Sequence, residues 1–194
     1  MGNGSTMKIS NTYELGPYGI RQLNENDLKM VFEWRNKDRI RNVMVSNKTI
    51  DWQDHLDWYD SHKMDSPYRY YIFSYKGRAI GYIGYNDFVA GVSCDPGMYI
   101  GEDEGIPITA GIAIFYMSTQ YAFEKLGMEV VHSYVRDDNA KSVAGTELMK
   151  FTNVPEKDAV IQGVKFRWYE TSKESWEKNR ENLKRFVVSD SMMR

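Results

Sequence analysis

The stretch from Met98 to Phe123 joins a short apolar run, a polar break and a long segment of small and apolar residues. Met98–Ile100 ends in a β-branched residue and predicts a strand, whereas residues 101–107 contain acidic and turn residues. Thr109–Gly111 has the composition of a helix start, with the Thr109 hydroxyl as its cap. Free backbone N–H groups and the helix dipole attract anions at such a start. The stretch therefore predicts either an anion-binding turn or an ordinary strand-to-helix connection.

Four other polar residues have positions that suggest chemistry. Asn139 follows a turn and precedes a helical segment, so it predicts a helix cap, a contact to a ligand amide, or both. His55 lies on an apolar helix face, which leaves a packed, hydrogen-bonded histidine and a functional one open. Tyr99 and Tyr134 fall in predicted strands, where each hydroxyl is either structural or a proton donor.

The composition excludes several classes of protein. With 25 basic and 27 acidic residues, the chain has no positive surplus for binding nucleic acid. Cys94 is the single cysteine, so no internal disulfide forms, and a reducing cytoplasm is expected. The histidines lack metal-ligand spacing, which predicts no metal site. No apolar run reaches the roughly 18–20 residues of a membrane span.

The elements that must position these residues follow from the apolar periodicity. Residues 1–16 are polar and glycine-containing, which predicts a flexible leader before a single domain at 17–194. Strands are expected at 19–23, 70–75, 79–86 and 129–135, and one or two strands within 160–171 with a break near Gln162-Gly163. Residues 89–95 are expected to be a loop or the start of the strand that ends at Ile100. Helices are expected from about 28, 51, 109, 140 and 172. The order predicts an α/β fold in which a mixed sheet has helices on both faces.

Several motifs then resemble the GNAT acyltransferase superfamily, and within it the branch that acetylates a UDP-linked 4-amino sugar for pseudaminic acid. The resemblance spans roughly residues 18–171, and it depends on the order and spacing of short motifs. These motifs are Trp34-Arg35-Asn36, Ile50-Asp51, His55-Leu56, Ile80-Gly81, Met98-Tyr99, Tyr121-Ala122-Phe123-Glu124, Tyr134-Val135, Asp138-Asn139 and Phe151.

The resemblance implies a central six- to seven-stranded mixed sheet with splayed central strands. The pantetheine arm of acetyl-CoA would lie between the strands at 98–100 and 129–135, with its pyrophosphate on the loop that ends at Gly111. A primary amine would take the acetyl group directly, without a covalent enzyme intermediate. The implied partner is a small-molecule amine, most simply a nucleotide sugar, and a monomer and a homodimer are both open.

The resemblance also implies roles for particular residues. The cofactor would contact Met98, Ile100, Ile106, Thr109, Ala110, Gly111, Asn139 and Ser142. The acceptor would contact Arg35, Met44 and His55. Tyr99 or Tyr134 would donate the proton to the leaving thiolate.

The sequence departs from the family pattern at two places. Ile106 and Thr109 stand where the family has Gln or Arg and the first glycine of Gly-x-Gly, and residues 102–104 add negative charge before the loop. Thr146 stands where the family commonly has the tyrosine that acts as acid, and a threonine hydroxyl is a poor acid. These departures keep open the alternative of a GNAT-fold binding protein without acetyl transfer. A separate alternative keeps the enzyme and changes the acceptor to a protein N-terminus or an aminoglycoside.

Overall fold

The computed structural model describes residues 12–188, which form one nine-stranded sheet in the order β1-β2-β3-β4-β5-β6-β9-β7, with β8 paired to β9. Neighbouring strands are antiparallel except β5 and β6, which are parallel. The longer strands are β2 (Tyr18–Gln22), β3 (Tyr70–Tyr75), β4 (Arg78–Val89), β5 (Ser93–Ile100), β6 (Val130–Arg136) and β9 (Val164–Ser172). The short ones are β1 (Tyr13–Leu15), β7 (Thr152–Asn153) and β8 (Ala159–Ile161). The sheet therefore has more strands than the six to seven that the family resemblance implied, because it includes these short edge strands.

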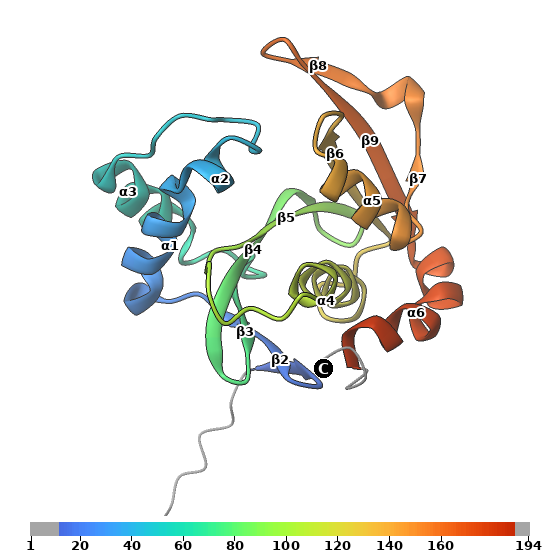
Figure 1. The fold of residues 1–194 in the computed structure, drawn as a ribbon, viewed down its shortest axis with the longest axis horizontal. Coiled ribbons are helices and arrows are strands. Elements are labelled where there is room, and N and C mark those ends of the chain that lie inside the picture. Colours follow the sequence, from blue (N-terminus) through green and yellow to red (C-terminus); the bar gives the residue numbers. More distant parts are fainter. Residues whose placement is uncertain (1–11, 189–194) are drawn as a thin grey trace, which may run out of the picture.

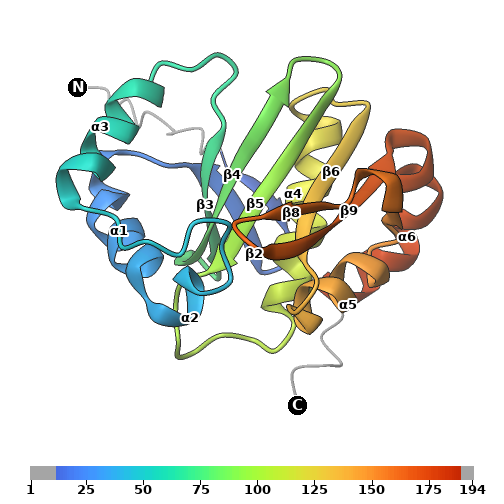
Figure 2. The ribbon, with the colours of Figure 1, turned by 90° about the horizontal axis from the view of Figure 1, so that it is seen from above.

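Helices cover both faces of the sheet, as expected (Figure 1, Figure 2). On β3, Tyr70 and Ile72 pack in the cluster with α1 (Leu28–Asn36), whereas Phe73 packs in the cluster with α4 (Ala110–Glu124). The remaining helices are η1 (Glu25–Asp27), α2 (Asp38–Arg41), α3 (Trp52–His62), α5 (Ala140–Leu148), η2 (Pro155–Lys157) and α6 (Lys173–Val188). The mixed α/β fold predicted from the sequence is therefore confirmed.

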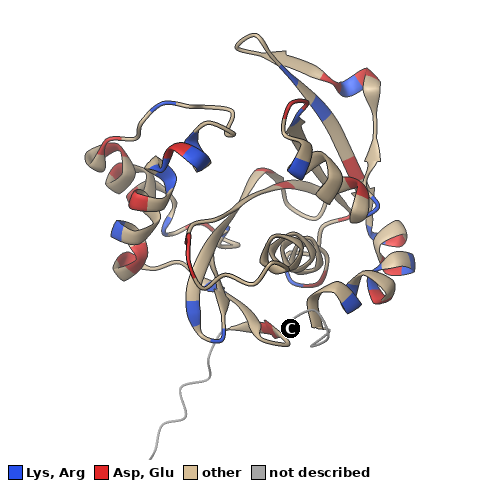
Figure 3. Ribbon diagram, viewed as in Figure 1, with Lys and Arg blue, Asp and Glu red and all other residues tan. Residues whose placement is uncertain are grey.

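Helix α4 is the central helix on the face of the sheet to which Phe73 belongs. Figure 3 shows it almost without charged residues, whereas α6 is strongly charged. Its buried residues include Met117, Ser118 and Thr119, so it is enclosed on most sides by β5, β6 and α6. The predicted stop is confirmed, since Gly127 adopts a φ of 69° just after the helix.

Strands β5 and β6 part after two paired positions, Ser93 with Val130 and Cys94 with Val131. Because the Gly101 N–H donates to Ile80 of β4, alternation along β5 turns the backbone groups of even-numbered residues toward β6. The next even-numbered residue after Cys94 is Pro96, which has no N–H to donate. The ladder therefore ends there, and the predicted splay is confirmed.

Two expectations about the ends of elements are wrong. Part of the leader expected at 1–16 is ordered, because Tyr13–Leu15 pair with β2 as β1; residues 1–11 lie outside the described residues. Thr109 does precede α4, but its side chain makes no capping hydrogen bond. Its Oγ1 instead lies 2.9 Å from the hydroxyl oxygen of Tyr18, so the threonine hydroxyl forms a buried hydrogen bond in place of the capping bond.

The end of β5 packs tightly on α1, and this contact gives the first testable prediction. A Cβ placed on Gly101 would lie 2.0 Å from Cδ2 of Trp34, which is 2% exposed. We expect Gly101→Ala to lower the free energy of unfolding by about 2–3 kcal/mol, because the rigid indole must move. Thermal unfolding followed by circular dichroism measures this loss.

Gly111→Ala is the matched control for this stability measurement. A Cβ on Gly111 meets nothing within 4 Å, and this glycine lies in the first turn of α4. The control should unfold at the same temperature as the wild type or higher. Equal stability of both variants would contradict the close packing of Gly101 on Trp34.

Candidate active site

A cavity of about 810 Å³ opens where β5 and β6 part. One wall comes from α1, α3 and the segment between α2 and α3, and the other comes from β6, α5 and the β8–β9 hairpin. The cavity brings together most residues for which the sequence predicted a function. These are Arg35, Met44, His55, Met98, Tyr99, Tyr134, Asn139 and Ser142.

The remaining predicted residues do not line this cavity but follow the loop from β5 to α4. Thr109 and Ala110 are buried, and the Ala110 N–H donates to the Pro107 carbonyl at 2.9 Å. The Thr109 side chain points toward Tyr18 and its φ is −81°, so neither its bulk nor its backbone angle requires a glycine. Gly111 is exposed and has open space on its Cβ side. Ile100 and Ile106 are partly buried against the α4 cluster.

Arg35 presents an unused hydrogen-bond donor in the cavity wall. Its Nη2 donates to the carbonyl oxygen of Ser46 at 2.9 Å, whereas its Nη1 is buried and has no partner among the described residues. Burial lowers the pKa of the guanidinium, and the nearby Tyr99 and Tyr82 partly offset this shift. A buried donor without a partner is costly, so this group is suited to an acceptor oxygen of a ligand.

His55 is a packed histidine that also borders the cavity. Its Nε2 lies 3.0 Å from the carbonyl oxygen of Leu28, and its ring packs on Phe32, Trp52 and Trp58. Burial lowers its pKa from 6.5, so the ring is neutral at neutral pH. The hydrogen bond to Leu28 makes Nε2 the protonated nitrogen.

Asp95 is the functional candidate that the sequence analysis missed. It lies on β5 one residue past the last pair with β6, and it lines the cavity. By strand alternation it shares a face with Tyr99, which packs in the α1 cluster. Burial raises the pKa of Asp95 to about 7, while the nearby Ser133 hydroxyl acts in the opposite direction. Its Oδ1 is buried and has no hydrogen-bond partner within residues 12–188. The one signal in the sequence was a carboxylate at the end of 89–95, a segment expected to be a loop or the start of the strand that ends at Ile100.

The hydroxyls near the splay differ in their suitability as acids. The Thr146 hydroxyl is fully buried and donates to the Ser142 carbonyl at 2.8 Å, which removes it as a proton donor to a ligand. Burial raises the pKa of Tyr99 well above 10, which makes it a weak acid. Tyr134 lines the cavity from β6 and packs edge-on against Trp168.

Asn139 begins α5, as predicted. Its Oδ1 accepts a hydrogen bond of 3.2 Å from the Ser142 N–H, and both residues line the cavity. This cap uses the carboxamide oxygen and leaves the amide nitrogen for a ligand. Asn139 can therefore cap the helix and contact a cofactor amide at the same time.

Within residues 12–188, no three His, Cys, Asp or Glu side chains lie together as metal ligands would. None of the helices in this part is long and apolar enough to cross a bilayer.

Acetyl-CoA fits the features around the splay. Met98 turns its N–H and carbonyl, and Ile100 its N–H, toward the gap between β5 and β6, where an extended arm can pair like an added strand. Gly111 admits a close approach at the N-terminus of α4, where backbone N–H groups bind phosphate. Bound there, acetyl-CoA supplies a thioester from which an amine takes the acetyl group.

Comparisons with known proteins agree with this geometry. The family model described as an acetyltransferase (GNAT) domain matches residues 19–152. Acetyltransferase PseH of Campylobacter jejuni subsp. jejuni serotype O:2 is 30% identical over 133 residues, which covers 68% of this chain and 80% of that protein. The spermidine N-acetyltransferase from Vibrio cholerae, solved with CoA and spermine, has a TM-score of 0.73 at 16% identity, covering 83% of this chain and 98% of that chain. The aminoglycoside acetyltransferase AAC(6')-Ib, solved with ribostamycin and CoA, has a TM-score of 0.70 at 15% identity, covering 84% and 97%.

The family model covers most of the sheet, the splay and the loop before α4. The match therefore favours an enzyme over a binding protein that merely shares the fold, despite Thr109 and Thr146. The chain belongs to the GNAT acetyltransferase family and is an N-acetyltransferase that uses acetyl-CoA.

Proposed function

We propose that this enzyme acetylates the primary amine of a UDP-linked amino sugar. The observation that carries this proposal is the buried Nη1 of Arg35, which has no partner in the described chain and lies in the cavity wall. A diphosphate supplies oxygen acceptors for a guanidinium. Trp58, Tyr82 and Tyr99 line the same cavity and offer apolar surfaces to a sugar ring or a base. The similarity to PseH supports an acceptor of this class.

In this proposal, Asp95 removes the proton from the acceptor amine. An ammonium has no lone pair for attack, so a base with a pKa near the working pH is required. Asp95 has such a pKa because it is buried, and it lies where β5 leaves β6. The amine forms the N–C bond while the C–S bond breaks. The backbone of β5 at Met98 and Ile100 contacts the acetyl oxygen and the pantetheine arm.

Tyr134 then donates a proton to the leaving thiolate. It replaces the family tyrosine at the position of Thr146, whose hydroxyl is already bonded to Ser142. We prefer Tyr134, which lines the cavity from β6, because burial raises the pKa of Tyr99 well above its usual value and makes Tyr99 a poor proton donor. Asn139 and Ser142 contact the cofactor from α5, and the backbone from Ile106 to Gly111 contacts its pyrophosphate.

A polyamine or an aminoglycoside is the second candidate acceptor. Asp54 and Asp87 line the cavity together with Asp95, and carboxylates suit a polycation. A bound polycation would, however, lie near the Arg35 guanidinium, which is charged and partly desolvated. This repulsion favours an acceptor that carries both an amine and a phosphate.

A turnover screen with acetyl-CoA tests the acceptor. The assay measures release of the CoA thiol. We expect a UDP-linked 4-amino sugar to give the highest kcat/KM, and spermine, kanamycin and a peptide N-terminus to give far lower values. The free 4-amino sugar is the matched control, since it keeps the amine and lacks the diphosphate. Preferred turnover of spermine or kanamycin would replace the proposed acceptor by the second candidate.

A further inference from the structure

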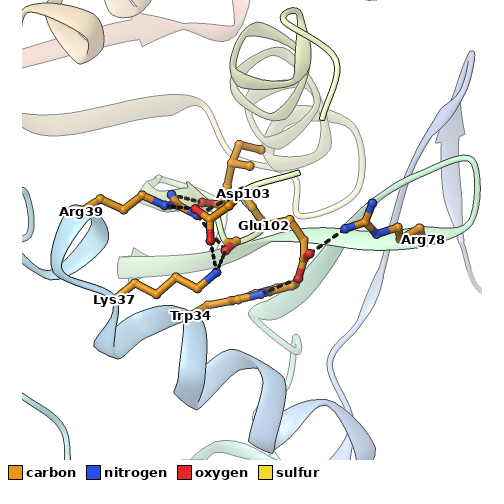
Figure 4. Close-up of polar contacts among 8 residues, drawn as sticks. Trp34, Lys37, Arg39, Arg78, Glu102 and Asp103 are labelled. Atoms are coloured by element: carbon orange, nitrogen blue, oxygen red, sulfur yellow. Dashed lines mark hydrogen bonds and ion pairs between the residues drawn. The ribbon is translucent and has the colours of Figure 1, made fainter. Parts of the chain in front are cut away.

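Two cations from the junction of α1 and α2 hold the backbone of the loop between β5 and α4. We call Lys37 and Arg39 the clamp and residues 101–109 the cofactor loop. Arg39 donates from Nη1 to the Ile100 carbonyl at 2.8 Å, and from Nη2 to the Gly101 and Glu102 carbonyls at 2.8 and 3.0 Å. Lys37 Nζ donates to the Gly101 carbonyl at 2.8 Å. Figure 4 shows both side chains reaching the loop from the same side. Three successive carbonyl groups are thus fixed in direction.

The clamp also binds the acidic residues of this loop. Asp103 accepts hydrogen bonds of 2.5 Å from each of the two clamp side chains, and these bonds lower the pKa of its carboxyl group. Glu102 accepts hydrogen bonds from Trp34 Nε1 at 2.9 Å and Arg78 Nη2 at 2.6 Å, which lower its pKa despite partial burial. The negative charge of the loop is therefore largely compensated by cations on its own side, which reduces its repulsion of a phosphate.

The cofactor loop connects the two parts of the cofactor site. Before it lies the open edge of β5 at Met98 and Ile100, and after it lies Gly111 at the start of α4. A free loop of this length would lose conformational entropy when a ligand orders it. The family's first loop glycine is replaced by Thr109, whose hydroxyl is tied to Tyr18. Both ends of the loop are thus held before any ligand binds.

We propose that Lys37 and Arg39 are positioning residues that hold the cofactor loop in its CoA-binding conformation. This inference rests on the cofactor site described above and extends it to a segment outside the loop. It also defines which edge of β5 remains for the pantetheine arm: since Arg39 occupies the Ile100 carbonyl, the groups left are the Met98 N–H and carbonyl and the Ile100 N–H. Lys37 and Arg39 follow Arg35 by two and four residues. One short segment therefore contributes both to the cavity wall that would contact the acceptor and to the contacts that hold the cofactor loop.

Arg39→Lys tests the clamp, because lysine keeps the charge but loses the planar fork that reaches three carbonyls. We expect CoA to bind about tenfold more weakly in isothermal titration calorimetry. Amide hydrogen exchange in residues 101–109 of the free variant should become faster, while exchange in β3 stays unchanged. The matched control is Arg185→Lys, an exposed residue of α6, which should bind CoA like the wild type.

Asp103→Asn separates positioning from simple electrostatics. If Asp103 only repelled the phosphates, its neutralisation would strengthen CoA binding; because it holds the clamp side chains, we expect binding to weaken. Unchanged or tighter CoA binding by both variants would overturn the clamp while leaving the cofactor site intact. A wild-type protein that bound no CoA would overturn the placement of the cofactor, and the clamp with it.

Discussion

Asp95→Asn should lower kcat by about 10²–10⁴-fold, the range that a general base contributes. The amide keeps the size of the side chain but accepts no proton from the acceptor amine. In the wild type, kcat/KM should rise as the pH increases through about 7, because the deprotonated carboxylate is the active form. The variant should lose this rise. Steady-state assays of thiol release between pH 5.5 and 9, with a UDP-linked 4-amino sugar, measure both effects.

The same substitution should change stability in the opposite direction. The folded state raises the pKa of Asp95 from 3.8 to about 7, so over this interval it binds more protons than the unfolded state. The free energy of unfolding of the wild type therefore falls as the pH rises between these two values, because folding then requires a charged carboxylate to be buried in a region of low dielectric constant. We expect the Tm of Asp95→Asn minus that of the wild type to be larger at pH 8 than at pH 4.

Asp60→Asn is the control for both measurements. This substitution makes the same chemical change on the exposed face of α3, where the Asp60 carboxylate pairs with Lys63 at 2.8 Å. Its activity and pH profile should match the wild type. If Asp95→Asn retained full activity and the same pH dependence, Asp95 would not be the base.

Arg35→Met should lower kcat/KM for the UDP-linked acceptor by about 10–100-fold, because a hydrogen bond to a charged group is worth about 1.5–3 kcal/mol. The loss should appear mainly in the KM of the acceptor. Arg35→Lys should recover only part of this loss. In the wild type, Nη2 bonds to the Ser46 carbonyl while Nη1 is free for the ligand, and a single ammonium group cannot make both contacts in this geometry. CoA binding, measured by calorimetry, should stay unchanged in both variants.

The comparison of two acceptors makes this prediction specific. For the free 4-amino sugar, which lacks the diphosphate, Arg35→Met should change kcat/KM little. An equal loss for both acceptors would show that Arg35 supports the shape of the cavity instead of binding phosphate. Arg185→Lys on α6 again serves as the variant expected to behave like the wild type.

The sequence alone was sufficient for features that depend on neighbouring residues. The aromatic run Tyr70–Tyr75 was predicted with the bounds that β3 has. The helix starts at Asp51 and Asn139 were predicted, and both side chains accept hydrogen bonds from backbone N–H groups of the first turn. The turn at Gln162 and Gly163 separates β8 from β9, and both residues have positive φ. Such signals act within about four residues, so a linear reading contains them.

The family resemblance gave information about residues far apart in the sequence, which none of these local signals does. It came from the spacing of many short motifs, and it led to the cofactor and to eight of the residues that line the cavity. Thr109 shows where motif comparison was insufficient. Its replacement of a glycine suggested a blocked loop, but the side chain points into the core toward Tyr18. Its direction depends on β2, which lies far away in the sequence.

Only the tertiary structure decided how the splay arises and what Asp95 and the clamp do. The effect of Pro96 follows from the register of β5 with β4, which turns its missing N–H toward β6. The pKa of Asp95 is raised by burial, which depends on elements that surround the cavity from distant parts of the chain. Arg39 reaches carbonyl groups more than sixty residues later in the sequence. Periodicity and capping are local, whereas burial, register and long-range hydrogen bonds exist only once the chain has folded.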